Sequence, residues 1–286
     1  MALNLYCSGS THSTLELLFQ KSPGEMSVRM KDISELGKNP NLISGIYNYC
    51  DRWCERCSFT ARCLVYATEE ADSDSDPASR DINNAAFWQK LASIFQETQE
   101  MISAWADENG VDLSPSALAE VNEQRDRQRG RARNHPLARA AEEYAHAVNQ
   151  WFENDFQQME VFSDAAADSS EKSEYDVNDY VEVIRWYQFF IAAKMNRGLL
   201  SRVDEDEYTA NEESRDSDGS VKAALIAIDR SLSAWKLMGE LRGENSDSIG
   251  KLLLDLEKLR LRAEEEFPRA RDFIRPGLDE NFDMMH

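Results

Sequence analysis

Apolar residues recur at intervals of three and four over much of the chain, and this period constrains the fold more than any other feature. Between residues 136 and 162 the stripe consists of Leu137, Ala141, Tyr144, Ala145, Val148, Trp151, Phe152, Phe156 and Met159. Such spacing places side chains on one face of an α-helix. The same period predicts further helices over residues 82–106, 177–198, 220–241 and 247–267, and Pro268 ends or kinks the last one.

No segment alternates apolar and polar residues in the manner of a β-strand, and 12 glycines and 7 prolines in 286 residues argue against a loop-rich chain. We therefore predict an all-α fold, an irregular multi-helix bundle with an N-terminal four-cysteine metal-binding segment. Residues 1–81 would hold the N-terminal helices and the metal site, and residues 82–286 the bundle, packed together as one domain. Three polar stretches are expected to connect helices at the surface: residues 69–81, 163–176 and 201–219.

Acidic residues dominate the charge of the chain. It holds 53 Asp and Glu against 32 Lys and Arg, a net charge of -21. This charge repels nucleic acid and anionic membranes, so neither is expected as a partner, whereas a basic protein is favoured. The start of the sequence lacks a basic region followed by an apolar run, and no run of about 18 apolar residues occurs. We expect a cytoplasmic protein without a membrane span.

Four of the five cysteines lie within 14 residues, with the spacing C-x3-C-x2-C-x5-C: Cys50, Cys54, Cys57 and Cys63. In a reducing compartment such a cluster predicts a metal site rather than disulfides. A helix could place Cys50 and Cys54 one turn apart, but Cys57 would lie about 10 Å from Cys50 along its axis. The helix is therefore expected to break near Cys54, and Cys63 to complete the ligand set. The role of the fifth cysteine, Cys7, stays open.

Two metal centres fit this spacing. A structural zinc usually takes two cysteine pairs separated by a longer loop, whereas short consecutive spacers are typical of iron–sulfur clusters. We predict an iron–sulfur cluster, of the 4Fe-4S type, with a single zinc ion as the alternative.

The first three cysteines resemble the C-x3-C-x2-C motif of radical-SAM enzymes over eight residues. Arg56 stands where that motif usually has an aromatic residue, and Cys63 supplies a fourth ligand where those enzymes leave one iron open. The chain also lacks the alternating β/α pattern of their barrel. The resemblance therefore implies a cluster and does not assign the family.

The residues around the cysteines fit a shielded, electron-rich centre. Three arginines interleave with them, Arg52, Arg56 and Arg62, and would offset thiolate charge unless they form surface ion pairs with nearby glutamates. Five aromatic residues could exclude water or simply pack in the core: Tyr47, Tyr49, Trp53, Phe59 and Tyr66.

Other groups of residues are weaker candidates for a functional site. Glu143 and His146 have the E-x-x-H spacing of di-iron bundles but no second copy, and we expect both to face solvent. Asp155 and Lys194 fall within apolar stripes, where each would either pair, line a pocket or extend to water. The arginine-rich run at residues 124–133 is expected to pair within the chain or to face solvent.

The sequence thus indicates a metal-binding protein whose process and catalytic residues, if any, are unknown. A cluster at Cys50, Cys54, Cys57 and Cys63 would serve electron transfer, redox sensing or structural stabilisation, with a redox or basic protein as partner. The alternatives are a zinc-stabilised helical module for protein–protein interaction and a helical enzyme with a structural metal site.

Overall fold

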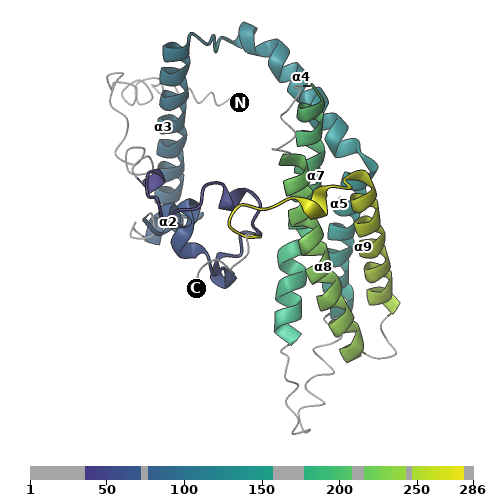
Figure 1. The fold of residues 1–286 in the computed structure, drawn as a ribbon. Helices are drawn as coiled ribbons and strands as arrows, with labels where there is room; N and C mark the ends of the chain where they lie inside the picture. The colour runs from purple at the N-terminus through teal and green to yellow at the C-terminus, as the bar shows by residue number, and fades with distance from the viewer. Residues whose placement is uncertain (1–35, 72–76, 157–176, 208–215, 243–246, 280–286) are drawn as a thin grey trace, which may run out of the picture. The chain divides into compact units, whose positions relative to one another are not determined.

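The computed structural model describes residues 36–71, 77–156, 177–207, 216–242 and 247–279. Within these ranges every regular element is helical and no strand occurs (Figure 1). The predicted all-α class is confirmed. None of the described helices combines the length and the hydrophobicity that crossing a membrane requires.

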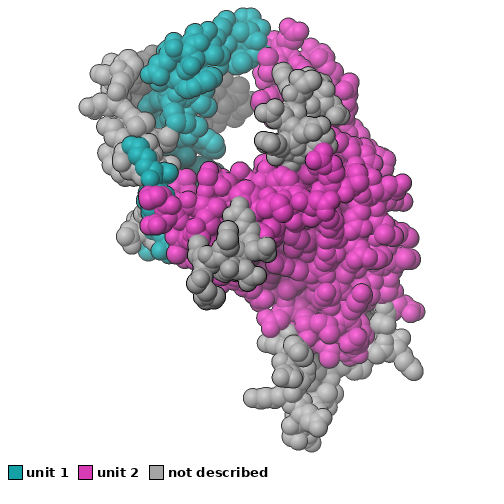
Figure 2. Space-filling model, viewed as in Figure 1, with its two compact units in different colours: residues 1–39, 68–118 teal, residues 40–67, 119–286 magenta. Residues whose placement is uncertain are grey.

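The chain divides into two compact units (Figure 2). The first comprises Met1–Asn39 and Thr68–Leu118, and the second comprises Pro40–Ala67 and Ala119–His286. The segment with the four cysteines therefore belongs to the same unit as the C-terminal helices. These boundaries differ from the division at residue 81 drawn from the sequence, which stays a prediction.

In the first unit the main described element is α3 (Ala85–Asn109), against which the short turn η5 (Pro77–Arg80) packs. The Asn84 side chain caps the start of α3 by accepting the Ala86 N–H at 3.0 Å. Gly110 ends the helix with φ of 67°, a left-handed conformation that glycine adopts without a Cβ clash. The helix predicted over residues 82–106 is thus confirmed, with a shift of three residues at each end.

Four helices of the second unit form a bundle: α5 (Pro136–Trp151), α7 (Val177–Glu207), α8 (Asp216–Arg242) and α9 (Asp247–Glu266). Each helix packs against two others, in the cyclic order α5, α7, α8, α9 (Figure 1). A π-helical turn, η6 (Phe152–Phe156), extends α5. Two helices cross the boundary between the units: α2 (Leu64–Ala71) and α4 (Pro115–Asn134).

The predicted stripe of α5 forms one wall of the core. Seven residues of this helix are buried: Leu137, Ala138, Ala141, Tyr144, Ala145, Val148 and Trp151. Pro136 occupies the first turn, where its missing N–H costs nothing, and the His135 side chain accepts the Leu137 N–H at 3.3 Å. At the centre the Trp235 indole N–H donates to the Tyr144 hydroxyl at 2.9 Å, so this buried polar pair is satisfied.

The two longest helices of this unit, α7 and α8, approach closely because small residues line their contact. A Cβ added at Gly198 would lie 2.5 Å from Cγ2 of Val221, closer than two carbon atoms can pack. Both helices extend into the acidic stretch 201–219 that the sequence suggested as a surface connection. That prediction is wrong at both ends, because α7 continues to Glu207 and α8 begins at Asp216. The stretch 163–176 lies outside the described residues.

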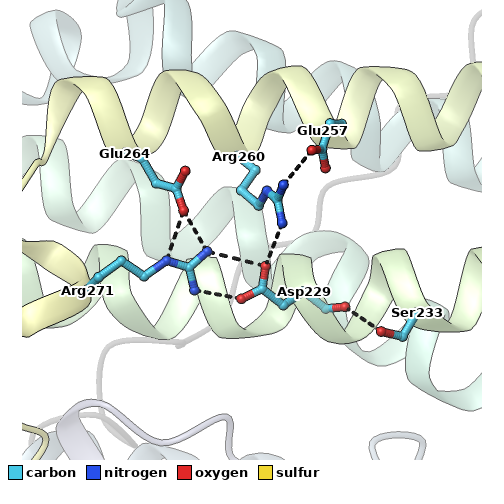
Figure 3. Close-up of polar contacts among 6 residues, drawn as sticks. All are labelled: Asp229, Ser233, Glu257, Arg260, Glu264 and Arg271. Atoms are coloured by element: carbon cyan, nitrogen blue, oxygen red, sulfur yellow. Dashed lines mark hydrogen bonds and ion pairs between the residues drawn. The ribbon is translucent and has the colours of Figure 1, made fainter.

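A network of ion pairs ties the C-terminal end of α9 and the turn η8 (Ala270–Asp272) to α8 (Figure 3). Arg271 contacts Asp229 at 2.6 Å and Glu264 at 2.8 Å. Arg260 bonds Glu257 and lies 3.6 Å from Asp229. As predicted, α9 ends before Pro268. Because Arg271 lies beyond that end and pairs with Asp229 of α8, the network fixes the direction in which the chain leaves the bundle.

Candidate metal centre

Three short 3-10 turns carry the cysteine-bearing segment: η2 (Ile46–Asn48), η3 (Cys54–Arg56) and η4 (Thr60–Arg62). The prediction that a helix places Cys50 and Cys54 one turn apart is therefore wrong. Cys50 lies in the loop between η2 and η3, Cys54 is the first residue of η3, and Cys63 lies directly before α2.

Backbone geometry explains why the chain coils here instead of continuing as a helix. Gly45 has φ of 75° and Arg52 has φ of 59°, both in the left-handed region. A non-glycine residue in this region is uncommon and costs free energy, so its surroundings must hold it in place. The Ile43 N–H donates to the Arg62 carbonyl at 3.0 Å, which brings the two ends of the segment together.

All four cysteines line one small cavity. Its volume is about 30 Å³, and four of the five aromatic residues noted in the sequence also line it: Tyr47, Trp53, Phe59 and Tyr66. Each cysteine is half-buried. Among the described residues, no three His, Cys, Asp or Glu side chains are arranged so that they could hold a metal ion. The four thiols thus converge on one space without forming a single-ion site in this arrangement.

Backbone N–H groups point at two of the sulfurs. The Phe59 N–H donates to Sγ of Cys57 at 3.4 Å, and the Arg52 N–H lies near the sulfur of Cys50, whose thiol donates to the Tyr47 carbonyl at 3.6 Å. Burial raises the pKa of the Cys50 thiol, and the Arg52 N–H opposes this rise. Hydrogen bonds to sulfur stabilise thiolates and tune the potential of clusters that they ligate.

Asp51, between the first two cysteines, anchors the segment to the bundle. Its Oδ2 accepts the Tyr187 hydroxyl at 2.7 Å and Nη1 of Arg230 at 2.6 Å. Its backbone carbonyl accepts the Trp186 indole N–H at 2.9 Å. Residues from α7 and α8 therefore hold the loop between Cys50 and Cys54 at three points.

The Asp51 contacts also set the charges of the residues involved. Burial alone would raise the pKa of Asp51, but the Tyr187 hydroxyl, the Trp53 N–H and the Arg230 charge outweigh it and lower that pKa. Burial, together with the hydrogen bond to Asp51, raises the pKa of Tyr187 to about 12. At neutral pH the anchor is therefore a carboxylate with a guanidinium and a neutral phenol.

Trp53 forms the aromatic contact between the segment and α7. Its ring is only 8% exposed and stacks on Trp186 at a centroid distance of 5.0 Å. The Arg56 guanidinium lies over the Trp53 ring, 4.3 Å from its centroid, and reaches α7, where it bonds Glu182 and, at 2.9 Å, Asp179. Arg56 thus pairs with α7 rather than with a glutamate of its own segment.

Tyr49 and Lys194 complete the attachment. The Tyr49 hydroxyl donates to Asp216 at 3.0 Å, and its ring packs edge-on against Phe273 at 4.8 Å. Tyr49 therefore faces α8 and the C-terminal segment, not the cysteine cavity. Lys194 is half-buried and donates to the Asn48 carbonyl at 2.7 Å, which settles the alternatives for this residue in favour of pairing.

The remaining candidates lie away from the cysteines. Glu143 and His146 are exposed, as expected, and Asp155 accepts the Ser248 hydroxyl at 3.5 Å. In the arginine-rich run, Arg127 pairs with Glu123 at 2.6 Å along α4. Cys7 lies outside the described residues.

The anchoring roles of Asp51, Trp186 and Arg230 were not predicted from the sequence. Asp51 lies between two candidate ligands, and this position could have indicated its role, because a carboxylate buried there needs a partner. Trp186 and Arg230 lie off the apolar stripes of their helices, so only the folded chain relates them to the cysteines.

No family model matches the sequence, and no curated protein or solved structure matches it either.

Proposed function

We propose that Cys50, Cys54, Cys57 and Cys63 bind an iron–sulfur cluster, and that the protein uses it for electron transfer or redox sensing. The observation that carries the proposal is the convergence of four thiols, from three short turns and the loops between them, on one cavity. Aromatic side chains around that cavity would limit water access, and the N–H groups of Arg52 and Phe59 would stabilise thiolate ligands. A bound cluster would supply a one-electron redox couple.

The choice of a cluster over zinc rests on spacing and geometry together. Four sulfurs around one zinc lie about 2.3 Å from the ion and contact one another. A cluster is a larger object that keeps its ligands apart, but a cavity of about 30 Å³ must widen to hold it. The 3-10 turns offer that adjustment, because few backbone hydrogen bonds hold each of them.

The position of the site suits exchange of electrons with another protein. The cysteines are half-buried, and the stacked pair of Trp53 and Trp186 leads from the buried Trp53 to a ring that is 38% exposed. A net charge of -21 favours a basic redox partner, and steering by such a charge weakens as salt increases.

The test is to measure iron, acid-labile sulfide, zinc and the absorption spectrum of the full chain purified without oxygen. We expect about four iron and four sulfide per chain, with broad visible absorption that dithionite bleaches and air restores. The variant that combines Cys50→Ser, Cys54→Ser, Cys57→Ser and Cys63→Ser should lose both the iron and the colour. Cys7→Ser, which removes the remaining cysteine, is the matched control and should keep them.

Three results would overturn the proposal. One zinc per chain without colour would make the segment a zinc-stabilised interaction module. A chain without metal, or iron that the quadruple serine variant retains, would remove the cysteines from any metal site.

A further inference from the structure

A second and larger cavity lies beside the cysteine cavity, with a volume of about 620 Å³. This volume falls within the range of about 300–1,000 Å³ that small-molecule sites occupy. The two cavities share part of their walls, including Cys50, Trp53 and Cys57, whereas Cys54 and Cys63 line only the smaller one. A molecule in the larger cavity would therefore lie against one side of the cysteine site.

Three arginines line this cavity, each from a different part of the unit: Arg56, Arg230 and Arg275. Each is held in place by a carboxylate through only part of its guanidinium. Arg230 uses Nη1 for Asp51 and Tyr187, and Arg275 uses Nε and Nη2 for Asp279. Within the described part of the chain, Nη2 of Arg230 and Nη1 of Arg275 have no further partner.

These unused groups are all donors, because a guanidinium cannot accept a hydrogen bond. Asp51 is the one carboxylate in the described lining, and Tyr187 and Arg230 already occupy it. The rest of the wall is largely apolar or aromatic, with Val183, Leu237 and Leu278 among its residues. The cavity thus combines fixed donors at its polar wall with an apolar surface.

We propose that this cavity binds a small organic anion, whose carboxylate or phosphate group meets Arg230 and Arg275 while its apolar body packs on Leu237 and Leu278. Arginine suits this role because it is always charged, so that Nη2 of Arg230 and Nη1 of Arg275 would each donate a charge-assisted hydrogen bond to an oxygen of such a group. The proposal rests on the pocket alone and does not depend on the metal centre. If both hold, the bound anion lies next to the sulfurs of Cys50 and Cys57.

Calorimetric titration of the full chain, as purified, with three related compounds tests the proposal. Benzoate and phenyl phosphate present the two anionic groups on one apolar ring, and benzyl alcohol is the neutral control. We expect saturable binding of at least one anion at millimolar concentration or below, and about tenfold or more weaker binding of the alcohol. Comparing the two anions shows whether carboxylate or phosphate is preferred.

Variants locate the binding. Arg230→Gln should weaken anion binding about tenfold or more. Because this substitution also loosens Asp51, a second variant is needed. Leu237→Trp fills the cavity and leaves every ion pair intact. Arg129→Gln removes an exposed arginine of α4 and should change nothing. Equal affinity for anions and alcohol, no saturable binding of either anion, or full binding by Leu237→Trp would each overturn the proposal.

Discussion

At the scale of single residues, hydroxyl and carboxylate groups far from one another in sequence decide where the cysteines lie. Tyr187 lies on α7, 136 positions from Asp51, and its hydroxyl donates to the loop between Cys50 and Cys54 at 2.7 Å. Because Asp51 also binds Arg230, removing one donor leaves the carboxylate paired but less firmly placed. The left-handed backbone at Arg52, one residue further, depends on such external contacts.

We expect Tyr187→Phe to lower the free energy of unfolding by about 1–2 kcal/mol and to speed the loss of iron from the cluster proposed at the cysteines. Tyr144→Phe is the matched control, since its buried hydroxyl accepts a hydrogen bond from Trp235 within the bundle. Urea unfolding should show similar destabilisation in both variants. Transfer of metal to a chelator should accelerate only in Tyr187→Phe, and equal rates in the two variants would contradict the anchoring role.

At the scale of elements, the sequence predicted the helices better than the site. The helices of the second unit have apolar stripes that repeat through four or more turns, and packing follows from such stripes. In the cysteine segment Ile43, Ile46, Tyr47 and Cys50 also recur at helical spacing, but the chain forms 3-10 turns of three residues there, and its course depends on Arg52 and on contacts with α7 and α8. The spacing of the four cysteines identified them as candidate ligands, but the helix predicted to carry Cys50 and Cys54 is absent from this described part of the chain.

The start of α8 offers a test of how closely the segment fits the bundle. A Cβ at Gly219 would lie 2.5 Å from the Tyr49 ring and 2.8 Å from the Phe273 ring, so both rings would have to move. Gly219→Ala should therefore destabilise the protein by about 1–3 kcal/mol, despite the higher helix propensity of alanine. The measurement is urea unfolding, together with the metal content of the variant.

Gly250 provides the control, because it is also the fourth residue of its helix, α9, and a Cβ there would meet no atom within 4 Å. Gly250→Ala should stabilise the protein by about 0.5–1 kcal/mol. If both alanine variants were stabilised, the packing of Tyr49 and Phe273 against α8 would be wrong.

At the scale of the second unit, its C-terminal segment packs against the cysteine segment near its N-terminal end. Figure 1 shows the chain leaving α9 and crossing to the segment that bears the cysteines. Leu278 lines the cysteine cavity, and Gly277, with φ of 69°, lies so close to Ile43 that a Cβ there would be 2.7 Å from it. The C-terminal segment therefore covers the cysteine cavity. Contacts that fix this segment in place also stabilise the cavity.

Asp279 is the main electrostatic contact of the C-terminal segment. It lies 2.8 Å from Lys222 of α8 and 2.8 Å from Arg275, and its side chain is 18% exposed. Although burial opposes it, hydrogen bonds from Arg275 and Lys222 hold the pKa of Asp279 well below its ordinary value. A carboxyl whose pKa is lower in the folded than in the unfolded chain stabilises the fold above the unfolded value, about 4 for aspartate. This stabilisation is lost as the pH falls from there through the folded value.

Asp279→Asn should accordingly lower the free energy of unfolding by about 2 kcal/mol at pH 7, and the difference from the unaltered chain should shrink as the pH falls below about 4. Urea unfolding at a series of pH values measures this difference, and the double variant with Lys222→Met shows how much of it belongs to that ion pair. Because the segment covers the cysteine cavity, Asp279→Asn should also make the cysteines react faster with a thiol reagent at neutral pH. A difference in stability that does not change with pH would mean that the loss comes from packing and not from the charge of Asp279.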